Sequence, residues 1–300
     1  MTLHFDEAEI RRLLRFADLI PAMERALAAF SAGRVLQPVR TMLTLEEERR
    51  YLGIMPAVTE DAMGVKVVSF YPGNAGTAVP THMATILLSR PDTGEPLAVL
   101  DGRLITEMRT AAVSAAVARR VAPPAAQVLA LLGSGVQAKA HLEALAAVRD
   151  FSEVRVWSRT PEHARRFAAE HGAIATDAAS AVADADVVVT ATTAIEPFLK
   201  GTWLKPGALV LAVGAPRPTW RELDDDAMRQ SLLIVDSRDA VQKESGDVIL
   251  SGASIHAEAG ELFAGTRSVP AGRTIVFKSV GLAVEDIAAA RLVYDLAMVR

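Results

Sequence analysis

The spacing of apolar residues changes along the chain, and each change predicts a different kind of structure. Residues 6–32 carry apolar side chains three and four positions apart, which predicts helix with a break at Pro21. Residues 40–100 instead contain short β-forming runs separated by Pro, Gly and Asn turns. This pattern predicts an antiparallel α+β region with strands at Thr41–Leu45, Gly64–Tyr71, Thr85–Ser89 and Pro96–Asp101.

A second pattern begins after an alanine-rich stretch, residues 103–120, that predicts one long helix ended by Pro123-Pro124. From Ala125 onward, apolar runs alternate with helical patterns, which indicates parallel strands joined by right-handed helical crossovers. The runs are almost continuously apolar, as expected of strands covered on both faces. The expected strands are Val128–Leu132, Val154–Ser158, Ile174–Thr176, Asp186–Ala191, Leu209–Gly214, Leu232–Asp236 and Thr274–Lys278, and a closing helix is expected over 283–298.

The two patterns together predict an α/β protein with two domains. A chain of 300 residues with 51% hydrophobic content can bury a large core, and its length favours two domains over one. The alternating part predicts a Rossmann-type dinucleotide-binding domain. The part before the proline pair predicts an α+β domain.

A glycine turn supports the dinucleotide-binding interpretation. The segment Gly133-Ser134-Gly135-Val136-Gln137-Ala138 follows an expected strand and opens a helix that ends near Val148. The glycines let the backbone turn sharply and approach a pyrophosphate, and the N–H groups at the helix start favour its negative charge. Ala138 is a small-residue variant of the third glycine in this motif. A glycine turn in another kind of α/β unit is the alternative.

The end of the next expected strand favours NADP(H) as the cofactor, with NAD(H) as the alternative. Enzymes that use the unphosphorylated dinucleotide usually place Asp or Glu here, to bond the ribose 2′-hydroxyl. This chain has Ser158-Arg159-Thr160, with Arg165 and Arg166 one turn further on. Cations and hydroxyl groups suit a 2′-phosphate. Alternatively, Arg159 is a solvated loop residue and Thr160 is the N-cap before Pro161.

Composition excludes several other classes of protein. The net charge is −4, aromatic residues are 5%, and no Lys/Arg block is present, so we expect no nucleic-acid partner. The absence of cysteine excludes disulfides, thiolate metal sites and a Cys nucleophile, and the six histidines form no metal-binding pattern, so we expect no metal. An acidic amino terminus and the lack of an apolar stretch of about 20 residues predict a cytoplasmic protein without membrane contact.

Four polar residues of the first part are candidates for chemistry. Lys66 lies inside an apolar strand, so its side chain is either on the solvent face or aimed into a cleft. Arg109 lies among small residues of the long helix, which leaves room for an anion. Each of Arg40 and Arg109, taken singly, is more often a surface salt-bridge partner than a ligand. His82 is the only histidine between two strands of the cleft-forming part.

Seven ordered motifs make the chain resemble the ornithine cyclodeaminase/mu-crystallin family over its full length, and the mu-crystallin branch in particular. The resemblance implies a two-domain homodimer in which the first domain and the last helix pair the subunits. The implied domains are residues 1–120 with 283–300 for substrate binding and dimerisation, and 121–282 for the cofactor. The motifs begin at Tyr51, Arg109, Gly133, Val154, Trp220, Lys243 and Phe277.

The resemblance also implies roles for individual residues. Lys66, Arg109 and Arg40 would be the catalytic cations that hold the substrate carboxylate, with His82 a further catalytic candidate. Ser279, Val280 and Gly281 would close the substrate pocket. The implied cofactor-binding residues are Thr81, Arg109, Gly133, Gly135, Val136, Gln137, Ser158, Arg159, Thr160, Thr192, Val213 and Gly214.

One departure from the family pattern indicates the reaction. Ornithine cyclodeaminases and alanine dehydrogenases of this family carry an Asp after the strand expected at Leu209–Gly214, where it handles the substrate amine, and this chain has Gly214-Ala215-Pro216-Arg217. The mu-crystallin branch also lacks it and reduces ketimines. We therefore expect NADPH-dependent reduction of small cyclic imino acids, with Lys66 orienting the substrate or supplying a proton. The alternatives are ornithine cyclodeaminase, an alanine- or opine-type amino-acid dehydrogenase, and a non-catalytic small-ligand-binding protein.

Overall fold

The computed structural model describes residues 2–47 and 49–299, which form two compact units. Unit 1 contains the chain up to Arg109 and from Gly281 onward, and unit 2 runs from Thr110 to Val280. The division therefore falls inside the long helix, eleven residues before the expected border, so the helix is shared by both units. No helix in the described ranges is long and apolar enough to cross a membrane. The functions assigned to the two domains stay predictions.

Unit 1 is built on a six-stranded sheet of order β1-β6-β5-β4-β3-β2, antiparallel except that β1 pairs parallel with β6. Its strands are β1 (Leu3–Phe5), β2 (Thr41–Glu46), β3 (Arg50–Val58), β4 (Met63–Phe70), β5 (His82–Ser89) and β6 (Pro96–Asp101). Its helices are α1 (Glu7–Leu13), α2 (Phe16–Ser31), the first part of α3 (Gly102–Val121), and α11 (Ala283–Met298).

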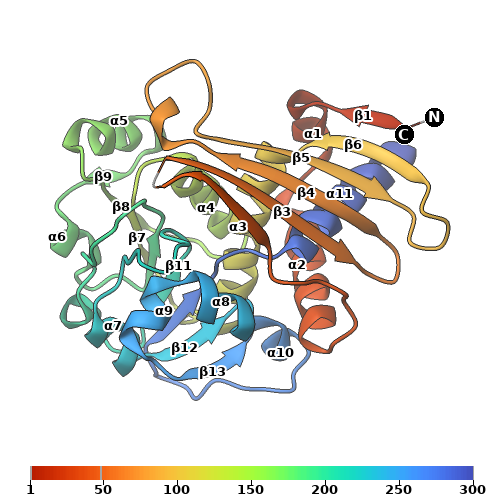
Figure 1. Ribbon diagram of the computed structural model, residues 1–300. Helices are drawn as coiled ribbons and strands as arrows, with labels where there is room; N and C mark the ends of the chain where they lie inside the picture. Colours follow the sequence, from red (N-terminus) through yellow and green to blue (C-terminus); the bar gives the residue numbers. More distant parts are fainter. Residues whose placement is uncertain (1, 48, 300) are drawn as a thin grey trace. The chain divides into compact units, whose positions relative to one another are not determined.

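The inward face of this sheet is covered by α11, which packs against β3, β4 and β5 while α1 and α2 pack against α11 (Figure 1). Alternation along β4 turns Lys66 and Val68 inward, and both are buried. Inward residues of the neighbouring strands, such as Met55 and Ile86, are buried as well. This face forms the core of unit 1.

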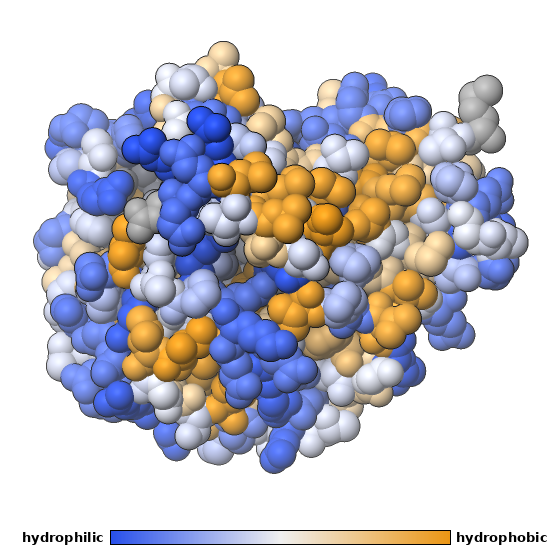
Figure 2. Space-filling view, in the orientation of Figure 1, coloured by the Kyte–Doolittle hydropathy of each residue, from blue (hydrophilic) through white to orange (hydrophobic). Residues whose placement is uncertain are grey.

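The outward face of the same sheet is also apolar, and part of it is exposed. Figure 2 shows hydrophobic side chains gathered over these strands. Exposed residues on this face include Ile54 of β3 and Val67 of β4, which are cross-strand partners, and Leu87 of β5, which pairs with Val65 of β4. Antiparallel sheets commonly have one face on the core and one face in solvent, whereas this sheet is apolar on both faces.

Unit 2 contains an eight-stranded, wholly parallel sheet of order β13-β12-β14-β11-β10-β7-β8-β9. The order reverses between β7 and β10, which is the switch point where doubly wound sheets bind dinucleotides. The predicted Rossmann-type fold is confirmed. The strands are β7 (Val128–Leu132), β8 (Glu153–Trp157), β9 (Ile174–Ala175), β10 (Val187–Thr190), β11 (Leu209–Ala212), β12 (Leu232–Val235), β13 (Ile255–Glu258) and β14 (Ile275–Lys278).

The helices of unit 2 join these strands. Helix α5 packs against β8 and β9, α6 against β7 and β8, and α7 against β12. Besides the second part of α3, they are α4 (Val136–Ala146), α5 (Pro161–His171), α6 (Ala178–Val182), α7 (Asp225–Gln230), α8 (Arg238–Glu244), α9 (Gly246–Ser251) and α10 (Ala259–Phe263).

The structure corrects several sequence expectations. The break predicted at Pro21 is wrong, because Pro21 lies inside α2 and the break falls at Leu14 and Arg15. Burial of Leu19 and other apolar residues of α2 offsets the hydrogen bond that the proline removes. The other corrections are strands that were not expected, β1, β3 and β13.

Candidate active site

Lys66 lies on the inward face of β4 and is only 1% exposed, so the solvent-face alternative is wrong. Its Nζ lies 2.6 Å from Oδ2 of Asp286, which is on α11. The same Nζ donates a 3.3 Å hydrogen bond to Oγ1 of Thr106, on α3. A buried ammonium group of this kind costs free energy unless it is paired, and Asp286 provides the pairing.

Arg109 is buried beside Lys66 and is not a surface salt-bridge residue. Its Nε donates to Oδ1 of Asp286 at 3.0 Å, and its Nη1 donates to Glu285. A single carboxylate, Asp286, therefore binds both Lys66 and Arg109. Within residues 2–47 and 49–299, Nη2 of Arg109 has no acceptor, so one donor edge of the guanidinium remains available to an anion.

Gly281 brings the third cation to the same place. Its carbonyl accepts a 2.7 Å hydrogen bond from Nη2 of Arg40. Its φ of +81° is in the left-handed region, and a Cβ at this position would lie 2.6 Å from Nη1 of Arg109. A side chain at residue 281 would therefore displace the guanidinium. We call Lys66, Arg109 and Arg40 the cationic cluster.

The charges of the cationic cluster act on one another. Burial, with help from Arg109 and Arg40, lowers the pKa of Lys66 to about 8, although Asp286 opposes the shift. Burial also raises the pKa of Asp286, but Arg109 and Lys66 outweigh burial and hold that pKa below its usual range. Three cations against the carboxylates of Asp286 and Glu285 leave a net positive charge, which suits an anionic ligand.

His82 is the first residue of β5, and the charges of the cationic cluster act on its imidazole. Burial, followed by the charges of Lys66 and Arg109, lowers the pKa of His82 to about 4. The imidazole is therefore neutral at physiological pH. Thr81 precedes it, and the Thr81 carbonyl accepts from the Tyr71 N–H at 2.7 Å.

Sequence analysis missed the acidic partners of the cluster, Glu285 and Asp286. The available signal was a pair of adjacent carboxylates among small and apolar residues in the first turn of the closing helix. Both are completely buried. Acidic residues that are fully buried are rare unless they are paired with cations.

In unit 2 the glycine turn lies at the switch point of the sheet. Gly133 has a φ of +122°, and a Cβ there would lie 2.6 Å from the Ala191 carbonyl oxygen, next to the end of β10. Gly135 is the N-cap of α4, without a side-chain cap, and space is open around it. Val136 is exposed, and the buried Oε1 of Gln137 has no hydrogen-bond partner in the described chain. The turn therefore has the room that a pyrophosphate needs, and the N–H groups at the start of α4 suit its negative charge.

The segment after β8 is exposed. Arg159 and Thr160 both face solvent, and Arg159 makes no hydrogen bond or ion pair with the residues that the structure describes. Thr160 is the N-cap of α5, with Pro161 following, but its hydroxyl makes no capping bond. The N-cap position is thus confirmed, whereas the capping hydrogen bond is absent. Ser158, between β8 and these residues, is half-buried.

Three of the predicted cofactor-binding residues, Thr192, Val213 and Gly214, lie just past the carboxyl ends of β10 and β11. The N–H groups of Val213 and Gly214 both donate to the Thr190 carbonyl, at 3.0 and 3.2 Å. Thr192 uses its N–H and its hydroxyl to bind Glu222, each at 2.7 Å. Glu222, which sequence analysis did not single out as a site residue, therefore fixes part of this edge.

Ser279 and Val280 follow β14 and are held by Asp236. The Ser279 hydroxyl and the Val280 N–H both donate to Oδ2 of Asp236, at 2.8 and 2.7 Å. Asp236 is fully buried at the end of β12. The hydroxyl proton of Ser279 is therefore already used inside unit 2, while Gly281 belongs to unit 1.

Comparison with known proteins shows similarity over the whole chain. The model of the ornithine cyclodeaminase/mu-crystallin family matches residues 2–299. The chain is 51% identical over 296 residues to the ketimine reductase mu-crystallin of Mus musculus, and the match covers 96% of this chain and 95% of the mouse protein. The resemblance found in the motifs is thereby confirmed.

Solved structures give the same picture. The Delta(1)-pyrroline-2-carboxylate reductase of Thermococcus litoralis, in complex with NADH and L-proline, superimposes with a TM-score of 0.94 at 35% identity, covering 99% of this chain and 98% of that chain. An archaeal alanine dehydrogenase dimer with bound NAD has a TM-score of 0.92 at 31% identity, covering 99% of this chain and 96% of that chain.

The lowered pKa of Lys66 predicts a pH dependence of stability. Between a folded pKa of about 8 and an ordinary value of 10.5, the unfolded chain binds more protons at this residue than the folded chain does. The free energy of unfolding should therefore gain a contribution that rises with pH, by about 1 kcal/mol per pH unit between about pH 8 and about pH 10. Urea unfolding of Lys66→Met should lack this slope. Lys139→Met, which removes an exposed lysine, should keep it, and equal slopes in all three proteins would contradict the lowered pKa.

Proposed function

Because the chain belongs to the ornithine cyclodeaminase/mu-crystallin family, we propose that it is an NAD(P)H-dependent reductase of cyclic imino acids. Its substrates are 1-pyrroline-2-carboxylate and 1-piperideine-2-carboxylate, and its products are L-proline and L-pipecolate. The similarity of the chain to a ketimine reductase and to a Delta(1)-pyrroline-2-carboxylate reductase supports this proposal. A cytoplasmic location and a role in proline metabolism stay predictions.

The observation that carries the proposal is the net positive charge of the cationic cluster. A cyclic imino acid presents one carboxylate beside its C=N bond. The free Nη2 edge of Arg109 and the guanidinium of Arg40 are the groups proposed to bind that carboxylate. Asp286 and Glu285 hold Arg109 from the other side, so the guanidinium is oriented before the substrate arrives.

The dinucleotide is proposed to bind to unit 2, with its pyrophosphate at Gly133, Gly135, Val136 and Gln137. When bound, it supplies the hydride that the imine carbon accepts. The open space at Gly135 and the N–H groups at the start of α4 fit this assignment. Thr192, Val213 and Gly214 are proposed to line the nicotinamide side.

Lys66 is proposed to handle the proton of the reaction. The imine nitrogen must carry a proton when its carbon accepts the hydride, because the product is an amine. A group whose pKa is near the working pH is the most effective at such a transfer, and the pKa of Lys66 is about 8. His82 is a weaker candidate because its imidazole is neutral at that pH.

The test of this function is NADPH oxidation with 1-pyrroline-2-carboxylate, followed by absorbance, with ornithine plus NAD and pyruvate plus ammonia as comparison reactions. Wild type should be fast with the cyclic imine alone. Lys66→Met should lower kcat by about 100-fold while NADPH affinity stays nearly unchanged, because Lys66 acts on the substrate. Ammonia release from ornithine without imine reduction would replace the proposal with cyclodeamination, and full turnover by Lys66→Met would remove Lys66 from the chemistry.

NADPH is the proposed cofactor because Ser158, Arg159 and Thr160 offer a cation and hydroxyl groups at the end of β8. Arg159→Asp removes the cation and adds a repelling carboxylate, so the ratio of kcat/KM for NADPH to that for NADH should fall by about tenfold or more. Arg273→Asp, another exposed arginine of unit 2, is the matched control and should leave the ratio unchanged. An unchanged ratio in Arg159→Asp would place the 2′-phosphate elsewhere.

A homodimer is proposed, with the outward face of the unit 1 sheet as the interface. The exposed apolar residues Ile54, Val67 and Leu87 favour this face, and one similar structure is described as a dimer. Val67→Lys would bury an unpaired ammonium group in such an interface, so sedimentation velocity should show a monomer where wild type is a dimer. Ile174→Lys, at an exposed position on β9 of unit 2, should remain dimeric. A monomeric wild type, or a dimeric Val67→Lys, would contradict the proposed interface.

A further inference from the structure

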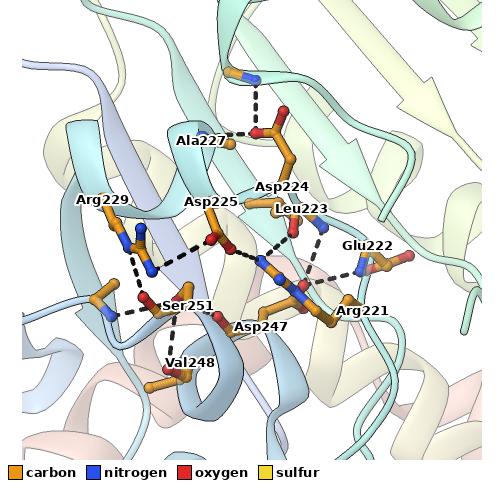
Figure 3. Close-up of polar contacts among 12 residues, drawn as sticks. Arg221, Glu222, Leu223, Asp224, Asp225, Ala227, Arg229, Asp247, Val248 and Ser251 are labelled. Carbon is orange, nitrogen blue, oxygen red and sulfur yellow. Dashed lines mark hydrogen bonds and ion pairs between the residues drawn. The ribbon is translucent and has the colours of Figure 1, made fainter. Parts of the chain in front are cut away.

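Unit 2 contains a second group of buried charges, at the carboxyl ends of β10, β11 and β14. The ammonium group of Lys278, which is fully buried at the end of β14, lies 2.8 Å from Oδ2 of Asp247 and donates to the Gly214 carbonyl at 2.7 Å. Oδ1 of Asp247 accepts from the N–H groups of Glu222 and Leu223, at 2.9 and 3.0 Å (Figure 3). The ion pair between Lys278 and Asp247 thus connects two segments. Lys278 binds the segment after β11 through the Gly214 carbonyl, and Asp247 binds the segment that carries Glu222 through the Glu222 N–H group.

Glu222 supplies a second carboxylate to this group. In Figure 3 its side chain points away from Asp225 and Arg229. It accepts three hydrogen bonds of 2.7 Å, from the Thr190 hydroxyl and from the N–H and hydroxyl of Thr192. A Cβ at Gly214 would lie 2.3 Å from its Oε1, so Glu222 also touches the segment after β11.

The buried group formed by Glu222, Asp247 and Lys278 contains unequal numbers of acidic and basic side chains. Glu222 and Asp247 contribute two carboxyl groups and Lys278 contributes one ammonium group, which is paired with Asp247, so the group contains one more acidic than basic side chain. All three side chains are fully buried. Burial raises the pKa of Glu222, and Asp247 adds to that rise, while Lys278 and the two threonine hydroxyls oppose it. A glutamine at position 222 would fill the same space without the cost of burying a charge. The carboxylate therefore needs a reason beyond packing.

We propose that Glu222 is a positioning residue for the nicotinamide, and that the net negative charge of Glu222, Asp247 and Lys278 makes unit 2 favour the oxidised over the reduced dinucleotide. This inference rests on the proposed function, which assigns Thr192 and Gly214 to the nicotinamide side. Both residues are in direct contact with Glu222. The ring gains a positive charge when its hydride leaves, and a fixed negative charge near it stabilises that change. Glu222 would thus favour hydride donation.

The test compares the affinities of NADP+ and NADPH for the purified protein, and it does not depend on turnover. NADPH binding is followed by its fluorescence, and NADP+ binding is measured by competition. In Glu222→Gln, Kd for NADP+ divided by Kd for NADPH should rise by about threefold or more, because the negative charge that favours the cationic ring is gone. A purely structural role would weaken both ligands alike.

A second variant and a matched control complete the experiment. Asp247→Asn removes the other carboxylate but keeps an oxygen that accepts from the N–H groups of Glu222 and Leu223. Its ratio of Kd for NADP+ to Kd for NADPH should therefore also rise. It also carries the test if Glu222→Gln does not fold. The control is Asp186→Asn. Asp186 lies just before β10, at the amino ends of the strands of the same sheet, and its carboxylate binds the N–H groups of Gln127 and Val128. Its ratio should equal that of wild type.

The outcomes separate the inference from the proposed function. If wild type binds both dinucleotides and neither Glu222→Gln nor Asp247→Asn changes the ratio relative to Asp186→Asn, the inference is overturned and the reductase proposal stands. If wild type binds neither dinucleotide, both are overturned. A raised ratio in the two network variants, with an unchanged ratio in the control, supports the inference.

Discussion

The pairing of two buried cations with one carboxylate is the constraint on which unit 1 depends. Lys66 and Arg109 are almost completely buried, and an unpaired buried charge costs several kcal/mol. Asp286 binds both, so a strand, the long helix and the closing helix are joined through a single side chain. The folding of unit 1 therefore places the candidate catalytic residues next to one another, because the core cannot form without bringing Lys66, Arg109 and Asp286 together.

The geometry at Gly281 follows from the same constraint. Arg109 must reach Asp286 and Glu285, and its guanidinium then lies where a side chain at position 281 would be. Only glycine gives the left-handed backbone and the missing Cβ that this approach needs. The Gly281 carbonyl in turn binds Arg40. One requirement, room for a buried guanidinium, thus decides the residue type and the backbone conformation at the start of the closing segment.

The sequence predicts the parts of this protein that depend on local pattern. The bounds of β6 and β7 agree with the predicted ones because both strands are short, almost continuous apolar runs. Strand β3 was missed because Gly53 and Pro56 are poor strand formers. In the fold, Pro56 lies past the stretch that pairs with β2, so its missing N–H costs no bond to that strand. Tertiary pairing there overrides local propensity.

The acidic partners could not be predicted in the same way. Arg109 and Asp286 are 177 positions apart, and no local period connects them. The same is true of Glu222, whose partners Thr190 and Thr192 lie about 30 positions earlier. A buried ion pair appears in a sequence only as a polar residue inside an apolar run, as Lys66 does. That signal marks one partner and leaves the other unknown.

The two units carry buried charge groups of opposite sign, and this difference matches the chemistry of imine reduction. In unit 1 the cationic cluster outnumbers its two carboxylates, whereas in unit 2 two carboxylates outnumber the ammonium group of Lys278. The acceptor of the hydride carries a carboxylate, and the donor becomes a cation as the hydride leaves. An excess of positive charge suits the first, and an excess of negative charge suits the second. Each excess of charge acts strongly only when it is buried, because water would screen it. This requirement explains why both groups of charged residues lie in the cores of their units.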